Sequence, residues 1–141
     1  MSLNQKGMTL IEIMIVIAIL GGLMSILVPN VLDSYTKARV KQSVMQLNNI
    51  KSALRNYLVD CGTFPSVDAG LEALLTDPGE GVCKQWGPRA YIDPRQLVDQ
   101  FGHKFAYDFD GAKITLTFFG KDGRPGGKGY NADVVEEDSV D

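Results

Sequence analysis

The feature that most constrains this chain is an apolar run close to its N-terminus, from Met8 to Val28. A helix needs about 20 apolar residues to cross a bilayer, and this run is long enough. It exceeds the apolar region of a signal peptide, and no A-x-A cleavage pattern follows Val28. Its one ionisable residue is Glu12, and a charge deep in a membrane helix costs roughly 2.5–3.5 kcal/mol. The run therefore predicts a membrane helix with a functional carboxylate, and a plain membrane anchor is the alternative.

The sequence after Pro29 predicts that the helix continues to about residue 60 and becomes amphipathic. The apolar residues at helical spacing are Val40, Val44, Leu47, Ile50, Leu54, Tyr57 and Leu58. This stripe is expected to pack on a folded domain, because the basic residues of the same stretch lie off it. Pro29 removes one helical hydrogen bond, and together with Gly21 and Gly22 it predicts a kinked or locally melted joint.

The second half of the chain predicts a small head. Ala69–Leu75 reads as a short helix, closed by the turn residues that follow it. Two strand-like runs, Phe105–Phe109 and Lys113–Phe119, flank Asp110-Gly111, which is a strong hairpin signal. The fold class is therefore α+β, with a long N-terminal helix packed on a head that holds a short second helix and a small antiparallel sheet.

Composition argues against nucleic-acid binding and against catalysis. The formal net charge is -3, and the 14 Lys and Arg residues are scattered rather than gathered in a basic patch. The single histidine, His103, is expected in a surface loop. No Ser/His/Asp set, phosphate loop or zinc spacing is present, so no enzyme is predicted. The acidic residues Glu136–Asp138 are expected to form a solvated end of the chain.

Cys61 and Cys83 are the only cysteines. In an oxidising compartment they form either a disulfide or two buried thiols, and their number and the compartment alone do not decide between these. A disulfide would close about 22 residues and add roughly 3 kcal/mol of stability by the loop-entropy model.

A glycine-rich loop, Phe119–Asp133, follows the predicted hairpin. Such a loop is too poor in apolar residues to bury a core of its own. Asp122 and Asp133 near its ends are hard oxygen ligands, and glycines let backbone carbonyls turn inward, as a calcium ion requires. The loop does not match the EF-hand pattern, so a merely flexible turn is the alternative reading.

The segment Lys6-Gly7-Met8-Thr9-Leu10-Ile11-Glu12 resembles the type III signal of type IV pilins and pseudopilins. The resemblance implies that a prepilin peptidase cuts after Gly7 and that the new N-terminus, Met8, is methylated. It also implies that Glu12 attracts the Met8 amine of the next subunit during assembly. The corresponding division is a leader at 1–7, a transmembrane and filament-core helix at 8–29, its amphipathic continuation at 30–60, and a periplasmic globular head at 61–141.

Two segments of the head resemble major pseudopilins of type II secretion systems. One is the Gly70-Leu71-Glu72-Ala73-Leu74 segment, and the other is the glycine-rich loop from Gly120 to Val134. The resemblance implies that this loop binds Ca²⁺. The implied ligands are the side chains of Asp122 and Asp133 and oxygens of Phe119, Arg124 and Asn131.

The resemblance implies a structural subunit that polymerises into a periplasmic pseudopilus and drives type II protein secretion. The implied partners are further copies of the chain, the prepilin peptidase, the inner-membrane assembly platform and minor pseudopilins. The chain is expected to cross the inner membrane once before assembly, with its N-terminus in the cytoplasm and its head in the periplasm. A type IV pilin for adhesion, motility or DNA uptake is the alternative.

Overall fold

The structure is a computed structural model that describes residues 7–140. Its elements are α1 (Leu10–Cys61), the 3₁₀ helices η1 (Gly70–Leu74) and η2 (Pro94–Leu97), the strands β1 (Ala106–Phe109) and β2 (Lys113–Phe118), the 3₁₀ helix η3 (Gly129–Asn131) and the strand β3 (Val134–Ser139). The chain forms two compact units that divide between Thr36 and Lys37. Except for Gly7, the predicted leader lies outside the described residues.

The N-terminal unit consists of the first part of α1. From Gly7 to Tyr35 every described residue is exposed, including the whole apolar run. Pro29 lies inside α1, so the structure has no melted joint there. The expected local melting was wrong, because the loss of one backbone hydrogen bond leaves the neighbouring turns intact. The side chains of Ser25 and Asn30 donate to the carbonyls of Gly22 and Ile26, at 2.8 and 3.2 Å.

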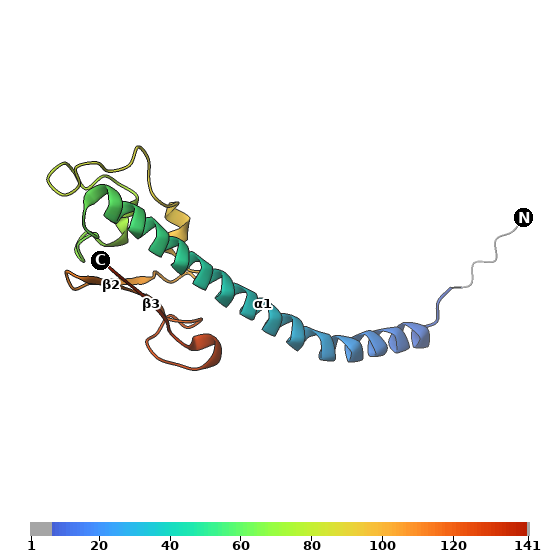
Figure 1. Ribbon diagram of the computed structural model, residues 1–141. Coiled ribbons are helices and arrows are strands. Elements are labelled where there is room, and N and C mark those ends of the chain that lie inside the picture. The colour runs from blue at the N-terminus through green and yellow to red at the C-terminus, as the bar shows by residue number, and fades with distance from the viewer. Residues whose placement is uncertain (1–6, 141) are drawn as a thin grey trace, which may run out of the picture. The chain divides into compact units, whose positions relative to one another are not determined.

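The second unit packs the amphipathic half of α1 against a three-stranded antiparallel sheet in the order β1-β2-β3 (Figure 1). The predicted stripe is confirmed: Leu47, Ile50, Leu54 and Tyr57 are buried, and the other members of the stripe pack against the core. Alternate residues of β2 supply the opposite side, because Ile114, Leu116 and Phe118 all point inward. Since every buried apolar residue in the described part of the chain lies between residues 47 and 118, this unit has a core of its own.

The predicted hairpin is confirmed, and a third strand, which was not predicted, pairs with it. β1 and β2 pair from Ala106↔Thr117 to Phe109↔Ile114, with Gly111 at φ 96° in the turn. β3 then pairs with β2 along its whole length, so the acidic residues 136–138 lie in an edge strand. The expectation of a solvated acidic end was therefore wrong. The predicted short helix at Ala69–Leu75 is a 3₁₀ helix, Gly70–Leu74, rather than an α-helix.

Ion pairs attach β3 to α1. Lys51 Nζ lies 2.9 Å from Glu136 Oε2, and Arg55 Nη2 lies 2.9 Å from Asp138 Oδ1. The geometry follows from two periodicities: residues 51 and 55 are one helical turn apart, and residues 136 and 138 lie on the same face of a strand. These two acidic side chains therefore face the helix, whereas Glu137 points away and pairs with Lys113 at 2.9 Å.

The Asp138 pair predicts a specific acid sensitivity of the head. The hydrogen bond from Arg55 holds the pKa of the Asp138 carboxyl below its ordinary value. A carboxyl whose pKa is lower in the folded than in the unfolded chain stabilises at neutral pH, and this stabilisation is lost as the pH falls below about 4. We expect Asp138→Asn to lower the urea midpoint at pH 7, and this difference to shrink as the pH falls below about 4. A midpoint difference that stays constant over that range would contradict the assignment.

Aromatic residues between η1 and β1 pack against the core. The Trp86 and Tyr91 rings pack edge to face, with centroids 5.4 Å apart, and Tyr91 packs against Tyr57 at 5.8 Å. The Trp86 indole donates to the Ala73 carbonyl at 3.1 Å, and the Tyr91 hydroxyl donates to Asp60 at 2.7 Å. These bonds satisfy the polar ends of the rings, as buried Trp and Tyr require.

The structure joins Cys61, the last residue of α1, to Cys83 by a disulfide with a Cα–Cα distance of 4.5 Å. Directly after Cys61, Gly62 takes a positive φ of 79° and its N–H donates to the Leu58 carbonyl, which ends the helix. The disulfide therefore fixes the loop that follows η1 to a well-defined helix end.

Candidate functional site

Glu12 and Thr9 form a capping box at the start of α1. Glu12 Oε2 accepts from the Thr9 backbone N–H at 2.8 Å and from the Thr9 hydroxyl at 3.0 Å. In return, Thr9 Oγ1 accepts from the Glu12 N–H at 3.3 Å. This reciprocal arrangement satisfies donors that a helix N-terminus leaves unpaired. The resemblance implied a partner for Glu12 in another subunit but not this partner within the chain, although the T-x-x-E spacing is a recognisable signal.

The exposed part of α1 is a second candidate site. It contains an 18-residue window that is apolar and long enough to span a membrane, and none of that window is buried. Its large exposed side chains include Leu10, Ile11, Ile17, Ile19, Leu23, Met24, Ile26, Leu27, Val31 and Leu32. A contiguous apolar surface of this size needs a lipid or a protein environment. Met8, the residue that would follow the cleavage site, is 77% exposed next to it.

The third candidate site is the loop between β2 and β3, shaped by five glycines with positive φ: Gly120, Gly123, Gly126, Gly127 and Gly129. At two of them the Asn131 backbone leaves no room for a side chain. A Cβ on Gly120 would lie 2.5 Å from the carbonyl carbon of Asn131, and one on Gly127 would overlap its carbonyl oxygen. The loop therefore closes around the Asn131 backbone.

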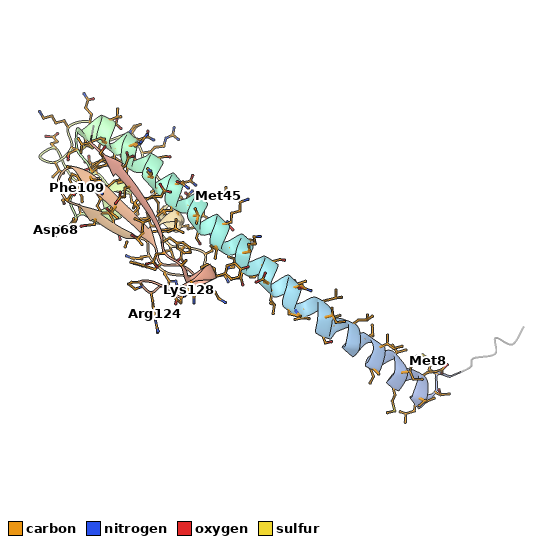
Figure 2. The ribbon with its side chains drawn as sticks, turned by 60° about the horizontal axis from the view of Figure 1, so that its bottom comes forward. Met8, Met45, Asp68, Phe109, Arg124 and Lys128 are labelled. Carbon is orange, nitrogen blue, oxygen red and sulfur yellow. A yellow bond between two sulfur atoms is a disulfide. The ribbon has the colours of Figure 1, made fainter. Side chains whose placement is uncertain are left out.

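The two aspartates of this loop each use one carboxylate oxygen to hold the backbone. Asp133 Oδ2 accepts from the Gly126 N–H at 2.8 Å, and Asp122 Oδ1 accepts from the Arg124 N–H at 3.3 Å. Both Asp122 and Asp133 are exposed. Among the described residues, the carbonyls of Phe119 and Arg124 accept no backbone hydrogen bond from another loop residue. Figure 2 shows the Arg124 side chain pointing outward from the loop, so only its backbone is a candidate ligand.

These donors fit calcium better than a transition metal. In residues 7–140 no three His, Cys, Asp or Glu side chains gather where they could share a metal ion. A cation in the loop would therefore take most of its ligands from backbone carbonyls and water, together with Asp122 and Asp133. Calcium accepts six to eight such oxygens in flexible geometry, whereas zinc prefers nitrogen and sulfur ligands.

Two family models together match nearly the whole chain. The family model of type II secretion system protein G matches residues 30–137, and the prokaryotic N-terminal methylation motif matches residues 2–28. The boundary between the two matches, at residues 28–30, falls at the end of the apolar run.

Individual relatives agree with these family matches. The chain is 38% identical over 133 residues to the type II secretion system core protein G of Vibrio cholerae, covering 93% of this chain and 90% of the relative. It is 36% identical over 139 residues to the protein of the same name from Pseudomonas aeruginosa, covering 96% and 97%.

A solved structure shares the fold. The crystal structure of the major pseudopilin from the type 2 secretion system of enterohaemorrhagic Escherichia coli matches with a TM-score of 0.58 and 24% identity, over 76% of this chain and 93% of that chain. The family models and these relatives show that the chain belongs to the type II secretion system protein G family, a family of structural subunits rather than enzymes, and the solved structure shares its fold.

Proposed function

We propose that this chain polymerises into a periplasmic pseudopilus that drives type II protein secretion. The observation that carries the proposal is the fully exposed apolar part of α1 in a chain whose second compact unit already has its own core. Before assembly, lipid covers this surface, and after assembly only other copies of the same helix offer a matching apolar environment. A subunit that leaves the membrane without such partners would expose the whole surface to water, which is strongly unfavourable.

The N-terminal residues supply the processing and register steps of this proposal. A prepilin peptidase removes residues 1–7 after Gly7, and Met8 becomes the methylated N-terminus of the helix. Its amine then pairs with Glu12 of a neighbouring copy. Glu12 Oε1 has no partner among the described residues, because the contacts with Thr9 all use Oε2 or the backbone. Glu12 can therefore keep its capping box and still accept an incoming ammonium group.

The proposed topology is a single pass of the inner membrane by residues 8–29, with the N-terminus in the cytoplasm. The helix continuation 30–60 and the head 61–141 then lie in the periplasm. The disulfide between Cys61 and Cys83 supports this placement of the head, because disulfides persist in the periplasm and are rare in the cytosol. The inner-membrane assembly platform and the minor pseudopilins are the further partners of such a subunit.

The direct test of this function is export in a bacterium that lacks its own protein G gene. We expect the unchanged chain to restore release of a secreted enzyme from these cells. We expect no filaments on the cell surface. Surface filaments without restored export would favour the type IV pilin alternative. A chain without the apolar run Met8–Val28 is the control, because its head remains intact but cannot enter the filament.

We also propose that the loop between β2 and β3 binds one calcium ion. Asp122 and Asp133 would supply carboxylate oxygens, and Phe119, Arg124 and Asn131 would supply backbone oxygens. A bound dication would offset the repulsion between the two carboxylates and tie the loop to the adjacent strands. The closed shape of the loop and its two partly unused carboxylates support this proposal.

Calcium is therefore expected to raise the thermal stability of a soluble fragment that begins at Asp33. Mass action predicts about 2.7 kcal/mol at one hundred times the dissociation constant. Melting curves in calcium and in excess chelator measure this gain, which Asp122→Ala and Asp133→Ala should abolish. Asp108→Ala is a matched control, because this exposed aspartate lies on β1 rather than in the loop. Equal melting temperatures in calcium and in chelator would exclude the site.

A further inference from the structure

The His103 ring lies against the backbone of the glycine-rich loop. A Cβ built on Gly123 would lie 2.6 Å from Cγ and Cδ2 of His103 and 2.7 Å from Nδ1, which is closer than real Cβ atoms approach other atoms. Gly123 also has a φ of 64°, a conformation that favours glycine. Two independent constraints thus require glycine at this position, and one of them is imposed by the histidine. His103 lies in a loop, as expected, but its ring is partly buried there.

The position of this ring is fixed by a tight turn. Asp99, which is 7% exposed, accepts from the N–H groups of Phe101 and His103 through the same oxygen, at 2.7 and 2.9 Å. The Asp99 N–H in turn donates to the His103 carbonyl at 2.8 Å. The ring itself makes no such bond through Nδ1, which is 3.6 Å from Asp99 Oδ2. His103 is therefore placed by its backbone and by packing.

The turn is itself fixed to α1. Ser43, which is fully buried, accepts from the Gln100 N–H at 3.1 Å and donates to the Arg39 carbonyl at 3.1 Å. Gln46 donates to the Val98 carbonyl at 3.3 Å. A continuous series of contacts thus runs from the helix through the turn to the ring, and from the ring to the loop.

From these contacts we propose that His103 is a positioning residue for the cation site of the loop. Gly123 lies between Asp122, a proposed calcium ligand, and Arg124, whose N–H holds the Asp122 carboxylate. The flat ring packs against one side of this turn and fixes the position of the Asp122 carboxylate before the ion binds. The histidine touches no ion; it lowers the cost of ordering the ligands. This inference rests on the proposed calcium site.

Calcium titration calorimetry of the full chain in detergent tests the proposal. We expect His103→Ala to weaken calcium binding about tenfold or more, as loss of a residue that orients a ligand typically does. His103→Phe keeps a flat ring and should bind calcium nearly as tightly as the unchanged chain. This rescue separates support by the ring from any hydrogen bond or charge of the imidazole. Unfolding in chelator reports separately whether each variant is folded.

A double-mutant cycle with Gly123→Ala provides the second measurement. Gly123→Ala alone should weaken calcium binding strongly, whereas in the His103→Ala background it should cost less, because the clashing ring is gone. If His103→Ala does not fold, the loss of calcium affinity caused by Gly123→Ala can instead be compared between the His103→Phe and His103→Leu backgrounds. Unchanged calcium affinity in folded His103→Ala would overturn the positioning role alone. No calcium binding by the unchanged chain would overturn both this role and the calcium site.

Discussion

Replacement of Glu12 by leucine is expected to abolish filament assembly while membrane insertion and the stability of the head stay unchanged. The substitution removes the one charge of the apolar run and also the capping box with Thr9. Insertion should persist or improve, because leucine is favourable in a bilayer where a carboxylate is costly. The head lies in a separate compact unit, so its core does not change.

The capping box makes Glu12→Gln the more informative variant. Glutamine can still accept from Thr9 and complete the box, but it has no charge with which to pair a neighbouring Met8 amine. If assembly depends on the charge, the Glu12→Gln and Glu12→Leu chains should both fail to form filaments. If the cap is what matters, Glu12→Gln should assemble normally, and the proposed intersubunit pair would then be wrong.

Shearing and pelleting of filaments, together with membrane fractionation of the same cells, measures assembly and insertion side by side. Ser25→Ala is a suitable control, since it changes an exposed polar side chain of the same helix without changing its charge. Filament loss in this control as well would indicate general sensitivity of the helix rather than a role for the carboxylate.

The sequence allowed the parts of the fold with a strong local period to be predicted. The helical stripe from Val40 to Leu58 and the hairpin around Asp110-Gly111 both appear where expected, since burial of one face imposes a regular spacing on apolar residues. The apolar run was equally clear. In each case the signal is contained in one short segment and needs no knowledge of what packs against it.

The strand β3 could not be predicted in this way, because its inward face carries Glu136 and Asp138 in place of apolar residues. Their partners, Lys51 and Arg55, are more than 80 residues away in the sequence. The two basic residues are one helical turn apart and the two acidic residues are two positions apart on a strand, so the charges can pair. This pairing can be recognised only once the strand is known to lie on the helix. His103 was placed in a loop but given no role for the same reason, since Gly123 becomes its neighbour only in the folded head.

Gly120→Ala is expected to cause a large loss of stability, even without calcium. Gly120 is buried with a φ of 64°, and a Cβ there would lie 2.5 Å from the Asn131 carbonyl carbon. The left-handed conformation alone costs an L-residue about 1–2 kcal/mol. Displacement of the Asn131 backbone should add a further cost of about 1–3 kcal/mol, comparable to overpacking in a core. Urea unfolding of the soluble fragment in chelator measures the sum.

Gly129→Ala separates these two contributions. Gly129 has nearly the same φ, 61°, but a Cβ there would meet no atom within 4 Å. It should therefore show only the conformational cost, and the difference between the two variants should report the steric contact with Asn131. Equal losses would mean that the Asn131 segment moves aside without cost, so the loop would be too soft to hold carbonyl oxygens in place for an ion. A clear difference would mean that the chain shapes the loop before any cation binds, as tight calcium binding by so few carboxylates requires.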